Sequence, residues 1–139
     1  MTKNDFFQQV RDLNLPLGKY AIFGSAPMVV RGLKEYRDID MVVSEDIWEE
    51  LSKKGWPIKY SEFGNPFLCY KEMEIGKDFW QPGVWNMREL INEADVIEGL
   101  PFVKLERVLE YKKMLGREKD LEDVKKIENF LQAQNLINK

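Results

Sequence analysis

The sequence contains no histidine, a single cysteine and no long apolar run. Without histidine, catalysis by Ser-His-Asp or Cys-His groups and every His-ligated zinc site are excluded. Because Cys69 has no second cysteine to pair with, we expect a reducing, cytoplasmic location, and we expect Cys69 itself to be a buried strand residue. No segment has the apolar length of a membrane-spanning helix or a signal peptide, so we expect no contact with a membrane.

The composition is that of a folded globular chain. Of its 139 residues, 44% are hydrophobic and 32% are charged, which predicts a packed core and a well-solvated surface. The net charge of -3 does not fit a dedicated nucleic-acid binder, which would carry a large positive field. We expect one domain over residues 1–139, with a core over about 18–103 and C-terminal helices over 104–136.

Strand-like apolar runs alternate with amphipathic helical segments along the chain. This order predicts an α/β (or α+β) fold, with a small mixed β-sheet, flanking helices and a helical C-terminal tail. We expect Asn4 or Asp5 to cap the first helix and Gly116 to separate the last two helices. We expect strands over 19–23, 38–43, 57–63 and 66–75. We expect helices over 28–36, 45–55 and 86–94. Residues 80–85 are expected to form a loop, and residues 95–103 are expected to be extended.

The stretch FGSAPMVVRGLKEYRDID, residues 23–40, places a small turn ahead of two aspartates. Gly24 permits a close approach to the backbone, and Ser25 can cap a helix that tolerates Pro27 in its first turn. The free N–H groups at the start of such a helix favour an anion. The pattern therefore predicts a phosphate-binding turn at Gly24 and Ser25.

Asp38 and Asp40 follow on a predicted strand, separated only by Ile39. Alternate side chains of a strand share a face, so the two carboxylates should point the same way, about 7 Å apart. Such a pair repels itself unless a cation lies between, and Mg²⁺ or Mn²⁺ is the natural oxygen-preferring partner. If the first two strands are neighbours, a triphosphate can lie with its phosphates on the turn and its metal on the aspartates. A solvated strand edge is the alternative for the aspartate pair taken alone.

The C-terminal stretch LERVLEYKKMLGREKDLEDVKKIENFL carries one apolar stripe from Leu105 to Leu115 and a second from Leu121 to Leu131. With the Gly-Ser turn and the Asp-x-Asp strand, it resembles the nucleotidyltransferase fold of the DNA polymerase beta superfamily over about residues 18–131. The likeness is to small nucleotidyltransferase-like proteins, including the toxin component of abortive-infection systems. Charges at these spacings also decorate ordinary helices. The residues that match the charges typical of that group are Lys112, Arg117, Lys119, Asp120 and Asp123.

The resemblance implies metal-dependent transfer of a nucleoside monophosphate from an NTP to an acceptor hydroxyl, with release of pyrophosphate. Asp38 and Asp40 match the first two of three carboxylates that hold Mg²⁺ or Mn²⁺. Glu74 is the first choice for the third because it alternates with apolar residues on an expected strand, and Asp78 and then Glu72 are the alternatives. Lys112 would contact the triphosphate, and Arg117 or Lys119 would contact the leaving pyrophosphate. The implied nucleotide-binding set is Gly24, Ser25, Lys112, Arg117, Lys119 and Asp120.

The acceptor remains open among RNA, protein and a small molecule. A partner protein, such as a toxin–antitoxin mate, or a homodimer would complete the site of so small a chain. The aromatic residues Trp80 and Trp85 flank a loop where a base can stack. The alternative function is a catalytically degenerate nucleotide-binding or regulatory module of the same fold, which the open identity of the third carboxylate favours.

Overall fold

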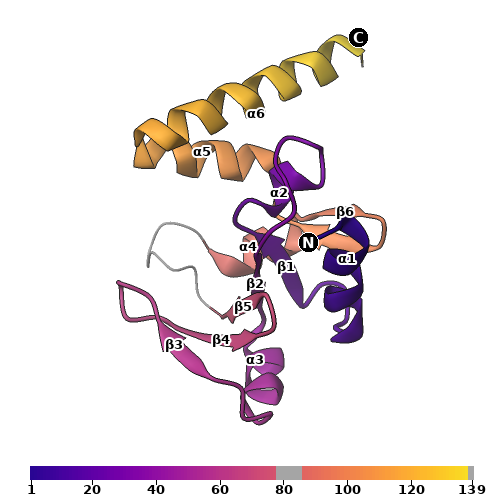
Figure 1. The fold of residues 1–139 in the computed structure, drawn as a ribbon, viewed down its shortest axis with the longest axis vertical. Coiled ribbons are helices and arrows are strands. Elements are labelled where there is room, and N and C mark those ends of the chain that lie inside the picture. The colour runs from indigo at the N-terminus through magenta and orange to yellow at the C-terminus, as the bar shows by residue number, and fades with distance from the viewer. Residues whose placement is uncertain (78–85, 138–139) are drawn as a thin grey trace.

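The computed structural model describes residues 1–77 and 86–137. Figure 1 shows a central sheet with helices beside it and the two last helices stacked together at one end of the molecule. The strands are β1 (Tyr20–Phe23), β2 (Ile39–Val43), β3 (Ile58–Tyr60), β4 (Pro66–Tyr70), β5 (Met73–Gly76), β6 (Asp95–Ile97) and β7 (Leu100–Phe102). The helices are α1 (Lys3–Asp12), α2 (Ala26–Val29), α3 (Glu45–Ser52), α4 (Met87–Asn92), α5 (Leu105–Leu115) and α6 (Glu118–Ile137).

The strands of the described ranges form one mixed sheet in the order β3-β4-β5-β2-β1-β7-β6. Strand β1 is antiparallel to β2 and parallel to β7, β2 is parallel to β5, and the other neighbouring pairs are antiparallel. The predicted α/β class with a small mixed sheet, flanking helices and a helical C-terminal tail is therefore confirmed. The segments that carry the Gly-Ser turn and the aspartate pair lie side by side at the centre of the sheet.

The two faces of the sheet are covered by different helices. Ile22 and Met41 lie on the face covered by α1 and α3, whereas Ala21 and Val42 pack with Leu90 and Ile91 near α4 on the other face. Asp40 shares that second face because it is two residues before Val42 on β2. A third apolar cluster, formed by Met28, Leu105, Val108 and Ile127, joins α2 to the C-terminal helices. Its burial fixes α5 and α6 beside the turn that follows β1.

The prediction that Asn4 or Asp5 caps the first helix is wrong, because the cap lies two residues before Asn4 and three before Asp5. Thr2 is the N-cap residue, and its hydroxyl accepts a hydrogen bond from the Asp5 backbone N–H at 3.1 Å. The Asp5 carboxylate in turn accepts one from the Thr2 N–H at 3.1 Å. This reciprocal capping box satisfies the backbone N–H groups of both Thr2 and Asp5 at the start of the helix.

The helix predicted over 28–36 is wrong in its extent, because α2 ends at Val29. Gly32 follows in the left-handed region, with φ +79°, which ends the helix. Strand β2 also starts later than predicted, at Ile39, so Asp38 precedes the strand. The alternation of side chains on a strand therefore does not orient Asp38 relative to Asp40.

The predicted break at Gly116 is confirmed: α5 ends there with φ +60°, and α6 begins at Glu118. Within the predicted second apolar stripe, Val124 and Ile127 are buried as expected, whereas Leu121 is 55% exposed. Cys69 is only half-buried on β4, and residues 95–102 form the β6–β7 hairpin. Of the helices in the described ranges, none combines the length and the hydropathy needed to span a bilayer.

Candidate functional site

The turn after β1 and the second aspartate touch. Strands β1 and β2 pair with Phe23 opposite Asp40. Gly24, the residue after Phe23, therefore lies against the Asp40 side chain. Gly24 has φ +65°, and a Cβ atom built on it would overlap the Asp40 side chain. The site therefore requires glycine at residue 24 for two reasons, backbone conformation and the space that Asp40 occupies.

The register of the sheet places Glu74 next to Asp40. Strand β5 runs parallel to β2, with Glu74 as the partner of Asp40. Burial, followed by the charges of Glu74 and Asp38 and a hydrogen bond with Glu74, raises the pKa of Asp40 to about 7. Close carboxylates behave this way, because the second negative charge is opposed by the first. Asp40 is therefore a buried carboxylate with like charges beside it, which a bound cation would stabilise.

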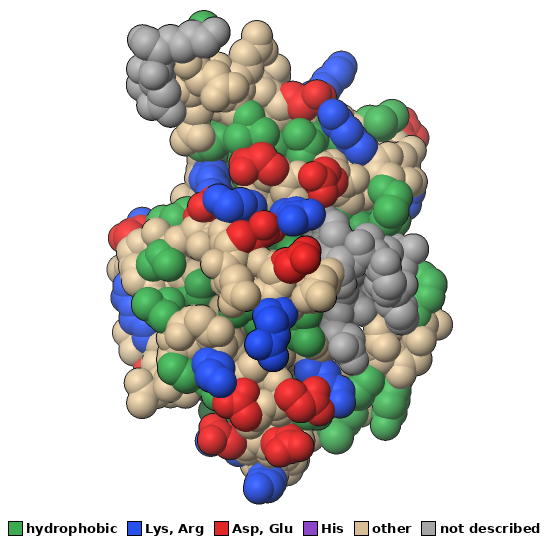
Figure 2. Space-filling model, turned by 180° about the vertical axis from the view of Figure 1, so that it is seen from behind, with side chains coloured by type: hydrophobic (Ala, Val, Ile, Leu, Met, Phe, Trp, Pro, Cys, Tyr) green, Lys and Arg blue, Asp and Glu red, His purple; other side chains and the backbone are tan. Residues whose placement is uncertain are grey.

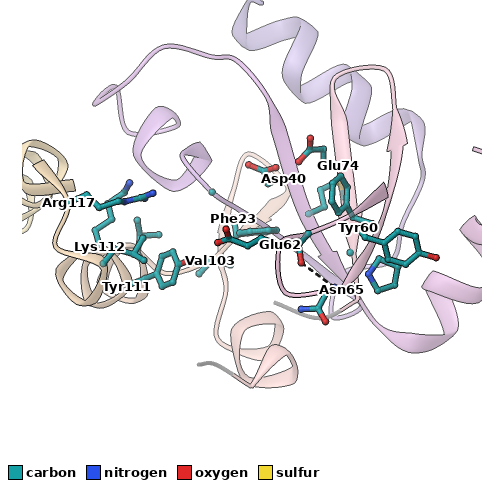
Figure 3. A pocket seen from close by; sticks show the side chains of 18 residues that line it. Phe23, Asp40, Tyr60, Glu62, Asn65, Glu74, Val103, Tyr111, Lys112 and Arg117 are labelled. Atoms are coloured by element: carbon teal, nitrogen blue, oxygen red, sulfur yellow. Dashed lines mark hydrogen bonds between the residues drawn. The ribbon is translucent and has the colours of Figure 1, made fainter. Parts of the chain in front are cut away.

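Asp40 and Glu74 open into a cavity of about 450 Å³, within the size range of small-molecule sites. In Figure 3 the two carboxylates lie on the sheet, and Tyr111, Lys112 and Arg117 face them from the region of α5. The β3–β4 hairpin supplies Tyr60, Glu62 and Asn65 to the wall. The cavity thus combines acidic groups on the sheet, basic groups near α5 and aromatic rings between them. Its aromatic lining is Phe23, Tyr60, Phe67 and Tyr111.

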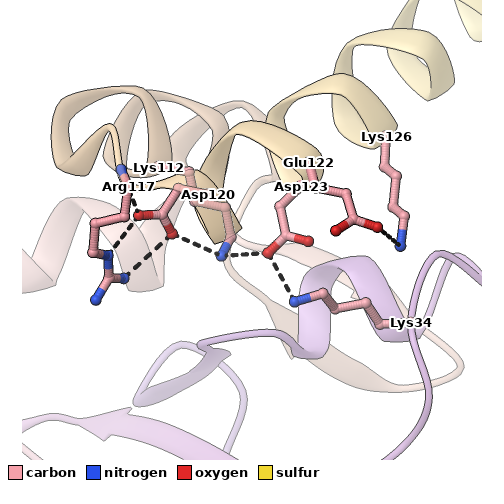
Figure 4. A network of polar contacts seen from close by, with 7 residues as sticks. All are labelled: Lys34, Lys112, Arg117, Asp120, Glu122, Asp123 and Lys126. Atoms are coloured by element: carbon pink, nitrogen blue, oxygen red, sulfur yellow. Dashed lines mark hydrogen bonds and ion pairs between the residues drawn. The ribbon is translucent and has the colours of Figure 1, made fainter.

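The basic residues at the cavity are held by two buried carboxylates on α6, as Figure 4 shows. The Arg117 Nε donates to Asp120 Oδ2 at 2.6 Å, and Asp120 is 1% exposed. The Lys112 Nζ lies 2.8 Å from Asp123 Oδ2, and Lys34 donates to the same oxygen at 2.7 Å. The hydrogen bond from Arg117 lowers the pKa of Asp120. Asp120 therefore acts on the cavity through Arg117 and does not line it.

A second cavity, of about 650 Å³, is lined by Ser25 of the turn and by the first aspartate but not by Asp40. Ser25 and Asp38 line it together with three cations, Lys34, Arg37 and Lys126. Figure 2 shows side chains of both charges mixed where the C-terminal helices meet the body of the molecule. Ser25 is the N-cap residue of α2, but its side chain makes no capping hydrogen bond. The helix start whose free N–H groups were expected to favour an anion belongs to a helix of only four residues.

The residues predicted to form the site are divided between two cavities. Gly24, Asp40, Glu74, Lys112 and Arg117 line the first cavity, whereas Ser25 and Asp38 line the second. Lys119 is exposed on α6 and is not among the residues lining either cavity. Glu72 is exposed and lies with Asp38 in a third depression, beside α1. Asp78, Trp80 and Trp85 lie outside the described residues.

Several residues of the site were missed by sequence reasoning. Lys34 falls in the segment that was predicted as helix, and no local pattern marks it as a partner of α6. Glu62 and Tyr60 come from a hairpin whose position over the cavity depends on the pairing of β3, β4 and β5. Tyr111 directly precedes Lys112 in the sequence. Adjacent residues on a helix point in different directions, so this position alone did not predict that both would line one cavity.

The donor set suits a hard divalent cation only in part. Asp40 and Glu74 offer carboxylate oxygens whose mutual repulsion a cation would remove, which fits Mg²⁺ or Mn²⁺. Asp38 is close enough for its charge to act on Asp40. Within residues 1–77 and 86–137, however, no group of three or more His, Cys, Asp or Glu side chains is already gathered as a metal centre.

The arrangement of strands, turn and helices is that of the nucleotidyltransferase fold. A candidate nucleotidyltransferase from Thermotoga maritima superposes with a TM-score of 0.57 and 19% sequence identity, over 93% of this chain and 96% of that one. The antibiotic-resistance factor ANT(2″)-Ia, solved with adenylyl-2″-tobramycin, gives a TM-score of 0.51 and 17% identity, over 95% of this chain and 88% of that one. No protein-family model and no curated protein matches the sequence. The likeness is therefore one of fold.

Proposed function

We propose that this protein is a metal-dependent nucleotidyltransferase that moves a nucleoside monophosphate from an NTP to an acceptor hydroxyl. The observation that carries the proposal is the meeting of Asp40 with Gly24 and Glu74 in a cavity whose opposite wall holds Lys112 and Arg117. Carboxylates on one side and cations on the other suit a metal-bound triphosphate. The nucleotidyltransferase fold of the solved structures supports this proposal.

In this proposal Asp40 and Glu74 hold the cation and Asp38 completes the set, while Asp78 remains an untested alternative. When bound, Mg²⁺ or Mn²⁺ neutralises the carboxylates and withdraws charge from the phosphates. The acceptor hydroxyl oxygen bonds to the α-phosphorus as the bond from that phosphorus to the β-phosphate oxygen breaks. Pyrophosphate leaves, and the hydroxyl proton passes to a carboxylate of the site.

The remaining residues bind and orient the nucleotide. Lys112 and Arg117 neutralise the phosphates, and Ser25 supports them from the turn. The base packs among the aromatic residues of the first cavity, where Tyr111 and Phe23 offer ring surfaces. Lys119 has no role in this scheme because its side chain lies outside the cavity.

For the acceptor we propose a small hydroxyl compound first. The complex of ANT(2″)-Ia with adenylyl-2″-tobramycin supports this choice, since that structure holds an adenylylated small molecule. The resemblance to abortive-infection toxins supports RNA or protein as the second candidate, with a toxin–antitoxin mate or a homodimer as partner in the cytoplasm. In either case the chain acts as one domain over 1–139.

Labelled transfer tests the proposal. The protein is incubated with each α-labelled NTP and Mg²⁺ or Mn²⁺, together with aminoglycosides, bulk RNA or protein extract, and both pyrophosphate and transferred label are measured. We expect transfer to one acceptor class that disappears when Asp40→Asn is combined with Glu74→Gln. Transfer that persists in that double variant would place the chemistry elsewhere.

The second candidate is a nucleotide-binding module without turnover. The absence of a gathered group of three potential ligands within the described ranges favours it. It predicts an NTP-dependent shift in thermal unfolding without release of pyrophosphate under any of the conditions above. No shift with any NTP would exclude both functions.

A further inference from the structure

One buried carboxylate on α6 contacts two lysines that come from different parts of the chain. Asp123 is 5% exposed, and its Oδ2 lies 2.8 Å from the Nζ of Lys112 and 2.7 Å from the Nζ of Lys34. Lys112 belongs to α5, whereas Lys34 lies in the connection between α2 and β2. Figure 4 shows the two ammonium groups approaching the Asp123 carboxylate from two sides.

The two lysines face different cavities. Lys112 lines the cavity that holds Asp40 and Glu74, and Lys34 lines the neighbouring cavity that holds Ser25 and Asp38. The side chains of Lys112 and Lys34 are 16% and 34% exposed, so neither lysine is fully buried by its contact with Asp123. Asp123 therefore links the cationic walls of both cavities.

The charges of this cluster favour an anion. Lys34, Lys112 and Arg117 supply three positive charges against the negative charges of Asp120 and Asp123, which leaves one positive charge in excess. Burial acts to raise the pKa of Asp123, but hydrogen bonds from Lys112 and Lys34 outweigh it and lower that pKa. Asp123 therefore remains ionised at neutral pH, and both lysines remain paired with it.

An immobilised lysine binds phosphate at a lower entropic cost than a free one. A lysine side chain loses much rotamer freedom when it is ordered. If Asp123 already orders Lys112 and Lys34, less of that freedom is lost when the phosphates arrive, which is the usual advantage of preorganisation. A buried ion pair is in itself weak evidence for a role in stability.

We propose that Asp123 is a positioning residue that fixes Lys112 and Lys34 as a two-armed clamp for the triphosphate, with one arm in each cavity. This inference rests on the proposed nucleotide function. It assigns a role in binding to Lys34, and it makes the contact between α6 and the α2–β2 connection part of the site.

The test compares Asp123→Asn with a matched control on the same helix. Glu128 also pairs with a lysine of α5, Lys113, at 3.4 Å, but both side chains are about half exposed, so Glu128→Gln removes an α5–α6 ion pair away from the cavities. Dissociation constants are measured by calorimetry for ATP, CTP, GTP and UTP with Mn²⁺, and for the corresponding nucleosides. Nucleosides carry no phosphate, so they report on the shape of the base pocket alone.

We expect Asp123→Asn to weaken binding of the preferred NTP by about tenfold or more, as loss of a supporting partner commonly does. Nucleoside binding should stay within about twofold, and Glu128→Gln should change neither constant. Because Lys34 acts through the same clamp, Lys34→Met should show the same selectivity for the triphosphate. Combining it with Asp123→Asn should weaken NTP binding by less than the product of the two single effects.

Equal or tighter NTP binding by Asp123→Asn would overturn the proposal, and so would a parallel loss of nucleoside binding. If Asp123→Asn does not fold, Lys34→Met decides the question, since Lys34 sits at the partly exposed end of the cluster. Failure of the unchanged protein to bind any NTP would refute the proposed function itself, which is a different outcome from normal binding by the variants.

Discussion

The carboxylate of Asp40 fills the space in which residue 24 would carry a side chain. Gly24 and Asp40 come from the ends of two antiparallel strands, and the pairing of Phe23 with Asp40 brings them into contact. The turn and the acid are therefore one structural unit. A substitution at either residue should therefore alter the position or the packing of the other.

Gly24→Ala should destabilise the protein by about 1–3 kcal/mol, because the new methyl group overlaps Asp40 and the backbone conformation is unfavourable for alanine. Urea unfolding measures the change. Gly55→Ala is the matched control, since Gly55 has a similar φ of +79° and a methyl group added there would meet nothing within 4 Å. If both variants lose the same stability, the overlap with Asp40 has no energetic consequence.

Asp40→Asn should make stability less dependent on pH. The pKa of Asp40 is about 7 in the folded protein and about 3.9 in an unfolded chain, so between these values the folded state holds the extra proton. Stability from this group is therefore full below about pH 4 and falls as the pH rises to about 7. In the presence of a chelator, the variant should be more stable than the unchanged protein at pH 8, by on the order of 2 kcal/mol, and equal to it near pH 4.

Asp46 provides a control, because its pKa is shifted in the opposite direction from that of Asp40. Hydrogen bonds from Ser44 and then Lys19 lower the pKa of Asp46 to about 2. Its contribution is therefore present above the unfolded pKa and is lost as the pH falls toward 2. Asp46→Asn should reduce the melting temperature at neutral pH, whereas Asp40→Asn should raise it. Melting curves from pH 4 to pH 8 that move in the same direction for both variants would contradict the assignment.

Manganese titration should separate the candidates for the third carboxylate. Glu74→Gln should abolish Mn²⁺ binding or weaken it by at least about tenfold, because Glu74 lies beside Asp40 in the sheet. Glu72→Gln should leave the affinity unchanged, since Glu72 lies in another depression. The readout is calorimetry with Mn²⁺, with and without NTP. Equal losses in the two variants would remove the preference for Glu74.

Arg117 and Lys119, the two alternatives for the contact with pyrophosphate, should differ in nucleotide binding. Arg117 lines the cavity and is held by Asp120, whereas Lys119 is exposed and lies outside the cavity. Arg117→Met should weaken NTP binding by about tenfold, and Lys119→Met, which removes the same charge, should have no effect. An effect of Lys119→Met as large as that of Arg117→Met would indicate that the nucleotide contacts α6 directly.

Local patterns predicted the fold class because hydrophobic periodicity and the helix-ending glycine at residue 116 have local causes. The same patterns misplaced the end of α2, since the effect of Gly32 on a marginal helix depends on what surrounds it. The resemblance implied a third carboxylate beside Asp40, and alternation along a strand only made Glu74 the first choice among the candidates, because the pairing of β2 with β5 is not local. The pairing of Lys34 with Asp123 could not be predicted, because it joins residues 89 positions apart through packing of α6.

The bend at Gly116 fixes where the first turns of α6 lie relative to α5. Arg117 follows the bend immediately, its backbone N–H and its side chain both bond Asp120, and Asp123 lies one turn further along α6. One residue inserted between Leu115 and Arg117 would change how α6 lies against α5 and disturb the contacts of Asp123 with Lys112 and Lys34, whereas Arg117 and Asp120 would move together. The distance along the chain between Lys112 on α5 and Asp123 on α6 is therefore fixed by the ion pair that joins the two helices.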